Sequence, residues 1–170
     1  KSIFDKLDFV IDRENTKSLF FTLKYKSIPN KRNTLMISVF DEVVKENDYK
    51  KVKILEIGRF LTCQTIESMY ANKLVSIMDR YNRHKRVAGR DIYDVNYFFL
   101  QGYEFKKEII KERTGMEVEE YIKKLIIFIE KEVTEDTINQ DLNILLPTEK
   151  FTKIRKTLKQ DTLLYLRNLI

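Results

Sequence analysis

The chain has 170 residues, 43% of them hydrophobic and 34% charged, a composition that excludes a disordered chain and is typical of a folded globular protein. Its 32 lysines and arginines outnumber its 26 aspartates and glutamates, and the resulting net charge of +6 permits an anionic partner without identifying one. The single cysteine excludes an internal disulfide, no apolar run approaches the roughly 20 residues of a membrane span, and the first residues do not resemble a signal peptide, so a cytoplasmic protein without membrane contact is predicted.

The first part of the chain is predicted to contain β-strands. Residues 1–11 suit a short helix or a strand. Residues 18–25 are aromatic and β-favouring, and residues 34–40 and 52–58 are compact apolar runs bounded by polar segments. Residues 41–51 are polar and are predicted to connect two strands. Together these segments are expected to form one small sheet.

From residue 65 the hydrophobic pattern becomes helical. A capping box of Thr114 and Glu117 is expected to begin one helix, and Pro147 precedes the last. Residues 136–147 are left unassigned. The predicted helices are 65–81, 91–101, 103–113, 114–133 and 148–170. The fold class is therefore α+β, with a sheet region at 1–58 and a helical domain at 59–170.

The helix predicted over 65–81 carries charge in its apolar stripe. At roughly 100° per residue, Lys73 falls in the middle of the stripe, Arg80 stacks on the same line two turns later, and Glu67 lies near the margin. Two explanations stay open: the cations extend their heads to water from a core edge, or they bind a phosphate or a carboxylate. The polar residues outside the stripe are predicted to face solvent: Ser68, Asn72 and Asp79.

The next helix opens with Arg90, Asp91 and Asp94, and the two aspartates share a face. Such carboxylates often only complement a helix dipole. A Lys73–Asp91 or an Arg80–Asp94 pair across the two helices would instead satisfy buried charge and organise a site. The basic loop between the helices suits either a triphosphate or RNA backbone, or plain exposure to solvent.

These residues resemble the signature of the AbiEii/AbiGii family of bacterial toxin nucleotidyltransferases. That signature has a Glu, then Lys-Leu, then Arg on one helix, and Arg-Asp-x-Tyr-Asp at the start of the next. Here it is matched by Glu67, Lys73-Leu74, Arg80 and Arg90-Asp91-Ile92-Tyr93-Asp94. The match spans about 30 residues with several fixed spacings.

The resemblance implies a polymerase-β-type nucleotidyltransferase, in which a small mixed sheet is followed by a helical domain. It implies a toxin of a type IV toxin–antitoxin or phage-defence system that uses a nucleoside triphosphate and Mg²⁺, has a cognate antitoxin, and modifies RNA, tRNA-like in related toxins, or a protein acceptor. Lys73 would contact phosphates, and Asp91 would orient Lys73 or act as a base. Arg80, Arg90, Asp94 and Glu67 would line the pocket.

The sequence also departs from the family pattern. The family's Gly-Gly or Gly-Ser turn and its Asp-x-Asp metal pair are not found, since Asp5 and Asp8 have the wrong spacing, so the chain is expected to be the C-terminal portion of a family member. Ser38 takes an expected acidic position, with Asp41 three residues later. The alternatives are therefore a non-catalytic RNA- or antitoxin-binding module and a purely structural helical domain.

Overall fold

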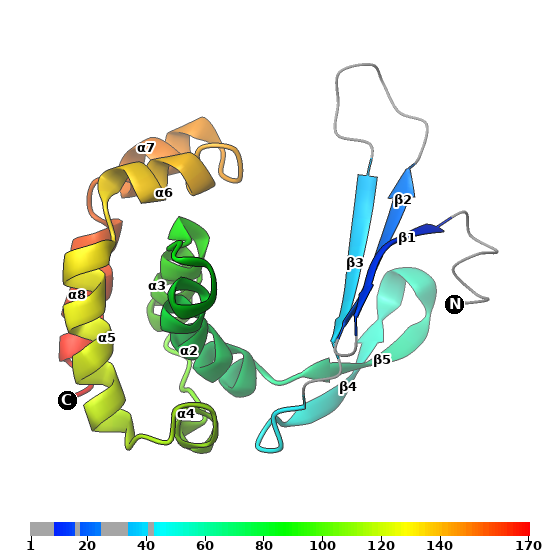
Figure 1. Cartoon of the computed structure of the whole chain (residues 1–170), viewed down its shortest axis with the longest axis horizontal. Coiled ribbons are helices and arrows are strands. Elements are labelled where there is room, and N and C mark those ends of the chain that lie inside the picture. Colours follow the sequence, from blue (N-terminus) through cyan, green and yellow to red (C-terminus); the bar gives the residue numbers. More distant parts are fainter. Residues whose placement is uncertain (1–8, 16–17, 25–33, 41–42) are drawn as a thin grey trace. The chain divides into compact units, whose positions relative to one another are not determined.

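The computed structural model describes residues 9–15, 18–24, 34–40 and 43–170. The chain forms two compact units, Lys1–Val43 and Val44–Ile170 (Figure 1). The predicted α+β class is confirmed, because strands precede a helical remainder. The expected domain boundary at residue 58 stays a prediction.

The first unit contains an antiparallel sheet in the order β1-β2-β3. Its strands are β1 (Phe9–Asn15), β2 (Ser18–Lys24) and β3 (Thr34–Phe40), and the register of β1 on β2 shifts between Ile11 and Arg13. The strands predicted over 18–25 and 34–40 are therefore confirmed. Both segments are rich in β-branched and aromatic residues, which favour strands. The mixed sheet is not found among the described strands, all of which pair antiparallel.

A separate hairpin, β4 (Tyr49–Ile54) with β5 (Arg59–Gln64), begins the second unit. The predicted single sheet is wrong, and the predicted strand over 52–58 is confirmed only for Val52–Ile54. The strand ends at Ile54 because a 3₁₀ turn, Leu55–Ile57, follows it, and Gly58 closes that turn with φ 61°. A glycine takes this left-handed conformation without the steric cost that a side chain adds.

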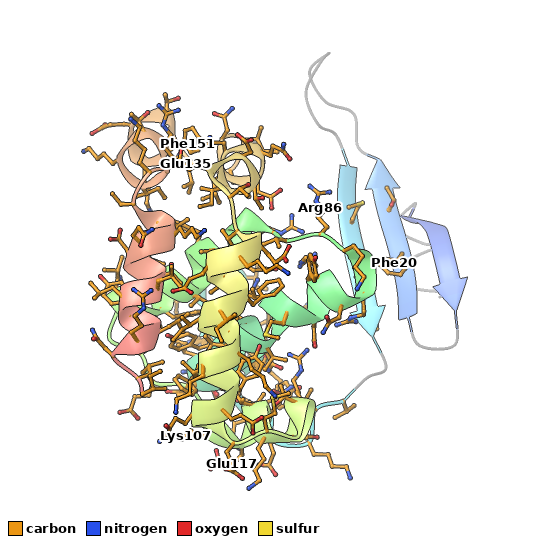
Figure 2. All side chains as sticks on the ribbon, turned by 60° about the vertical axis from the view of Figure 1, so that its left-hand side comes forward. Phe20, Arg86, Lys107, Glu117, Glu135 and Phe151 are labelled. Atoms are coloured by element: carbon orange, nitrogen blue, oxygen red, sulfur yellow. The ribbon has the colours of Figure 1, made fainter. Side chains whose placement is uncertain are left out.

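The described helices follow the hairpin: α2 (Ile66–His84), α3 (Gly89–Leu100), α4 (Lys107–Thr114), α5 (Val118–Glu132), α6 (Glu135–Leu142), α7 (Thr148–Ile154) and α8 (Leu158–Arg167). Helix α2 packs on α3 and α4, and α8 packs on α3 and α5 (Figure 1 and Figure 2). Their apolar stripes meet in one core, whose fully buried side chains include Leu74, Ile92, Ile110, Leu125 and Ile129. No helix in residues 43–170 is both long enough and apolar enough to span a bilayer.

Two predicted helix ends are corrected. Thr114 is the last residue of α4, where its hydroxyl donates to the Ile110 carbonyl at 2.6 Å, so it does not cap α5. The expected last helix is two helices, α7 and α8, separated by a turn in which the Thr157 N–H donates to the Ile154 carbonyl at 3.1 Å. The unassigned residues 136–147 contribute most of α6, which is capped by the Thr134 hydroxyl.

The segment that precedes the hairpin, residues 44–48, is hydrogen-bonded to α4. The Glu112 carboxylate accepts the backbone N–H groups of Lys45 at 2.8 Å and Glu46 at 2.9 Å. The hydrogen bonds from Glu46 and Lys45 hold the pKa of the Glu112 carboxyl below its ordinary value. Lys106 adds an ion pair to Asp48 at 2.9 Å. These contacts fix where the hairpin begins relative to α2 and α4.

Candidate functional site

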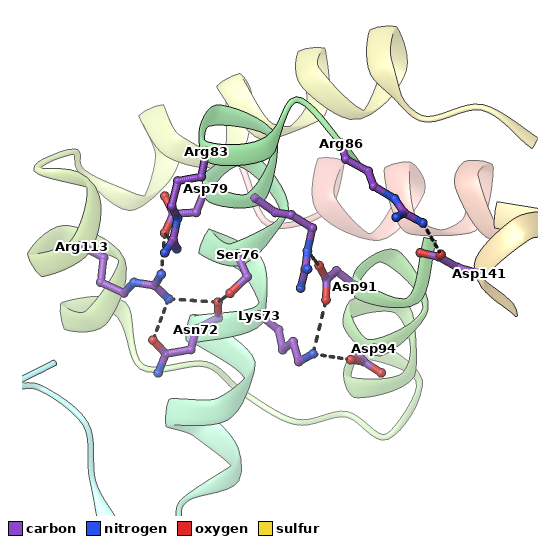
Figure 3. A network of polar contacts seen from close by, with 11 residues as sticks. Asn72, Lys73, Ser76, Asp79, Arg83, Arg86, Asp91, Asp94, Arg113 and Asp141 are labelled. Carbon is purple, nitrogen blue, oxygen red and sulfur yellow. Dashed lines mark hydrogen bonds and ion pairs between the residues drawn. The ribbon is translucent and has the colours of Figure 1, made fainter. Parts of the chain in front are cut away.

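A buried carboxylate lies where α2 meets the first turn of α3. The side chain of Asp91 is only 1% exposed, and each of its oxygens binds a cation from α2 (Figure 3). Lys73 Nζ lies 3.4 Å from Asp91 Oδ1, and Arg80 Nε donates to Asp91 Oδ2 at 2.8 Å. Lys73 Nζ also lies 2.6 Å from Asp94 Oδ2. We call these four residues, Lys73, Arg80, Asp91 and Asp94, the charged seam.

The local sequence explains why these groups meet. The Thr65 hydroxyl accepts the Ser68 N–H and starts α2. Lys73 and Arg80 are two turns apart on the resulting helix and therefore lie on one line. Their side chains are 36% and 34% exposed. The stems lie at the core edge while the charged heads bind carboxylates, so the heads are not simply solvated.

One of the two predicted pairings is confirmed. Lys73 does pair with Asp91. The Arg80–Asp94 pair is wrong, because Arg80 binds Asp91 instead and Asp94 binds Lys73. Asp94 lies one turn further along α3 than Asp91, and that turn places it beside Lys73 rather than beside the more distal Arg80. Asp91 thereby becomes the carboxylate that both cations share.

Two further predicted site residues lie outside the charged seam. The Glu67 side chain is exposed, and its backbone carbonyl accepts a hydrogen bond from the Lys106 N–H at 3.2 Å. The Arg90 side chain is also exposed, and across residues 43–170 it forms no ion pair. A pocket role for Glu67 and Arg90 stays a prediction.

The residues predicted to face solvent form a second polar network beside the charged seam. Arg113 of α4 donates to Asn72 Oδ1 at 2.8 Å and pairs with Asp79 at 2.5 Å (Figure 3). Asn72 in turn donates to Asn47 at 2.7 Å, and Ser68 is fully buried. That prediction was wrong because polar residues three and four apart form a stripe of their own, which another helix can cover. The spacing of these polar residues in the sequence is the signal that could have predicted their contacts.

The basic loop between α2 and α3 is partly structural. Arg86 lies 3.5 Å from Asp141, and Arg83, in the last turn of α2 before the loop, lies 3.6 Å from Asp79. Lys85 ends α2 in the left-handed conformation, with φ 52°, and its amine lies 5.4 Å from the centre of the Tyr81 ring. These basic side chains therefore contact groups of the protein itself, although the Arg86 side chain is 71% exposed.

The described residues do not fit a metal centre. Across the described ranges, no three His, Cys, Asp or Glu side chains are grouped closely enough to hold an ion. Asp91 and Asp94 already bind cationic side chains. Ser38 lies exposed on β3, opposite Phe20, and offers only a hydroxyl. Asp5, Asp8 and Asp41 fall outside the described residues.

A sequence profile described as nucleotidyl transferase AbiEii toxin, type IV TA system, matches residues 3–168. The match includes the strands as well as the helices and so extends far beyond the 67–94 signature. No curated protein and no solved structure matches the chain.

Proposed function

Because the chain belongs to the AbiEii nucleotidyl transferase toxin family of type IV toxin–antitoxin systems, we propose that it transfers a nucleotide from a nucleoside triphosphate either to RNA, tRNA-like RNA in particular, or to a protein acceptor. The charged seam is the proposed centre. The observation that supports this is the burial of Asp91 between Lys73 and Arg80. An unneeded buried carboxylate would cost stability, because burying charge is expensive even when it is paired.

Asp91 suits an orienting role better than that of a base. Its side chain is 1% exposed, and both oxygens are engaged by cations. A general base must come within hydrogen-bond reach of the hydroxyl that it deprotonates. A carboxylate enclosed in this way instead holds the amine of Lys73 and the guanidinium of Arg80 in place. Asp91 is therefore proposed as the residue that positions both cations.

Lys73 and Arg80 are the proposed phosphate ligands. Arg80 uses Nε for Asp91, and its two terminal nitrogens form no hydrogen bond with any residue that the structure describes. Lys73 is about one-third exposed, and its second carboxylate partner, Asp94, is equally exposed. A fixed pair of cations stabilises the charge that develops on a transferred phosphoryl group, since they need no rearrangement during the reaction.

The family relationship also implies a divalent metal ion, with Mg²⁺ as the expected one, and a cognate antitoxin. The described residues lack a cluster that would hold the ion. No residue in 43–170 or in the described strands is therefore assigned as a ligand of this ion. This observation favours a second candidate function, a non-catalytic module that binds RNA or the antitoxin through the charged seam. In the third alternative, the seam only locks α2 to α3.

The test is a transfer assay with the protein, labelled nucleoside triphosphates, Mg²⁺ and cellular RNA. Lys73→Ala is expected to lower transfer by about 100-fold or more, the usual cost of losing one preorganised charge-stabilising group. Lys123→Ala is the matched control, because Lys123 also pairs with a carboxylate, Glu119 at 2.6 Å, but lies on α5 outside the seam. The control should keep full activity.

Each result separates the candidates. Transfer that is lost in Lys73→Ala and kept in the control supports the enzyme. Absence of transfer from any nucleotide to RNA or protein, by protein confirmed as folded, would reject the enzyme. If the protein transfers no nucleotide but binds RNA or the antitoxin in a way that depends on Lys73, the result supports the non-catalytic binding module. If neither transfer nor binding responds to Lys73→Ala, the structural lock is what remains.

A further inference from the structure

The β4–β5 hairpin has one face that carries two aromatic rings and two lysines. Directly paired residues of an antiparallel hairpin point to the same side, as do residues two apart on one strand. The pairs Tyr49–Gln64, Lys51–Thr62 and Lys53–Phe60 therefore share a face. We call it the cationic face, formed by Tyr49, Lys51, Lys53, Phe60, Thr62 and Gln64.

The large groups of the cationic face are in water. Phe60 is 66% exposed and Tyr49 is 56% exposed, and the side chains of Lys51 and Lys53 are exposed as well. Neither lysine forms an ion pair with any residue in the described part of the chain. An open hollow of about 380 Å³ is lined by Lys51, Phe60, Leu61 and Thr62.

The opposite face of the hairpin is different in character. Val52, Ile54 and Cys63 are half-buried there, and Leu61 is 48% exposed. Each face thus carries two cations, but the aliphatic side chains are gathered with Lys50 and Arg59 on one face, and both aromatic rings lie with Lys51 and Lys53 on the other. An isolated two-stranded hairpin is marginally stable in water, so an element of this kind gains from a partner on its open face.

The charge of the hairpin indicates the partner. From Tyr49 to Gln64 there are four basic residues and one acidic one. They are Lys50, Lys51, Lys53 and Arg59 against Glu56. A protein interface is typically depleted of lysine at its centre, whereas lysines beside exposed rings are the usual means of holding a nucleic-acid strand. The rings accept stacked bases, and the ammonium groups accept phosphates.

We infer that the cationic face binds a single-stranded segment of RNA, with bases stacked on Phe60 and Tyr49 and phosphates paired with Lys51 and Lys53. Residues two apart on a strand are roughly 7 Å apart, a spacing comparable to that of neighbouring phosphates in an extended strand. The inference deepens the proposed function, on which it rests for RNA as the acceptor, by naming the surface that holds the acceptor strand.

The test measures binding without catalysis. A fluorescein-labelled, mixed-sequence RNA of about 12 nucleotides, within the range that such surfaces cover, is titrated with the protein without nucleotide or Mg²⁺, and anisotropy is recorded at several salt concentrations. Lys51→Ala with Lys53→Ala is compared with Lys50→Ala with Arg59→Ala. Both double variants lose two positive charges from the hairpin, but the second pair points to the opposite face.

The cationic-face double variant is expected to weaken binding at least tenfold and to reduce the log–log salt slope by about 1.4, or 0.7 for each lost phosphate contact. Its opposite-face counterpart should keep the parent slope. Phe60→Leu keeps an apolar side chain but has no ring, and it should weaken RNA binding about tenfold. Phe60→Trp keeps an aromatic ring and should bind RNA as tightly as the parent protein does. Circular dichroism confirms folding of each variant.

Equal losses in both double variants would overturn the inference, because they would indicate unspecific attraction. Unchanged RNA binding in Phe60→Leu and in the cationic-face variant would also overturn it, and loss of antitoxin binding alone in these variants would make the face a protein surface. If the folded protein transfers no nucleotide but the two double variants differ in RNA binding, the proposed transfer fails and this inference stands.

Discussion

Replacement of Asp91 by Asn tests the energetic reasoning behind the charged seam. The change removes the one negative charge that Lys73 and Arg80 share. Breaking a fully buried ion pair costs about 3–5 kcal/mol, because a charge is left without a partner. The two cations here keep 36% and 34% exposure and can turn to water, so we expect a loss of about 2–3 kcal/mol of unfolding free energy.

Asp94→Asn is the informative comparison. The distances to Lys73 predict that this variant loses more stability than Asp91→Asn, whereas burial predicts that it loses less. Lys73 Nζ is closer to Asp94, at 2.6 Å, than to Asp91, at 3.4 Å. Asp94 is 36% exposed, however, and half-exposed pairs contribute less than about 1 kcal/mol. Urea unfolding followed by circular dichroism measures both variants. A loss in Asp94→Asn equal to or greater than that in Asp91→Asn would refute the argument that burial of Asp91 dominates.

Four further variants test stability. The pKa of the Glu112 carboxyl in the folded protein lies below its ordinary value of about 4.5. The hydrogen bonds of the ionised carboxylate therefore stabilise the fold above about pH 4.5, and this stabilisation is lost as the pH falls through the folded pKa. The difference in melting temperature between the parent and Glu112→Gln should therefore be seen at neutral pH and vanish in acid. Gly89→Ala should destabilise by about 1–3 kcal/mol in urea, because the added Cβ would lie 2.8 Å from the backbone of Ile138; a neutral change would contradict that packing. Tyr121→Phe should cost about 1 kcal/mol because the hydroxyl donates to a carbonyl of α2. Tyr70→Phe should be neutral or stabilising, because the buried Tyr70 hydroxyl has no partner within the described residues; similar losses in the two tyrosine variants would be inconsistent with this difference.

Local patterns predicted the elements where a single signal dominates. The strand Thr34–Phe40 and the helix from Ile66 follow from a compact apolar run and from a clear helical stripe. The meeting of Lys73 and Asp91 also followed from sequence, since charge in an apolar stripe needs a partner.

What the sequence did not predict depends on geometry between elements. The choice of Asp91 over Asp94 by Arg80 depends on how α3 crosses α2, which helical phase does not specify. Ser68 is buried where its hydroxyl accepts the Asp48 N–H, and Asn72 accepts a hydrogen bond from Arg113 of α4; both contacts come from elements that the pattern of α2 does not specify. The turn closed by Gly58 does not follow from the sequence pattern, because the residues before it continue a strand-like apolar run.

The charged seam is electrically neutral by itself, with two cations and two carboxylates. A phosphate that approaches Lys73 must therefore either arrive with its own counter-ion or displace an anion already present. Asp91 is enclosed, so Asp94 is the anion that can leave, because its carboxylate already has access to water. Under the proposed function, Asp94 would therefore be an exchangeable counter-ion, which holds Lys73 in place until a phosphate oxygen replaces it.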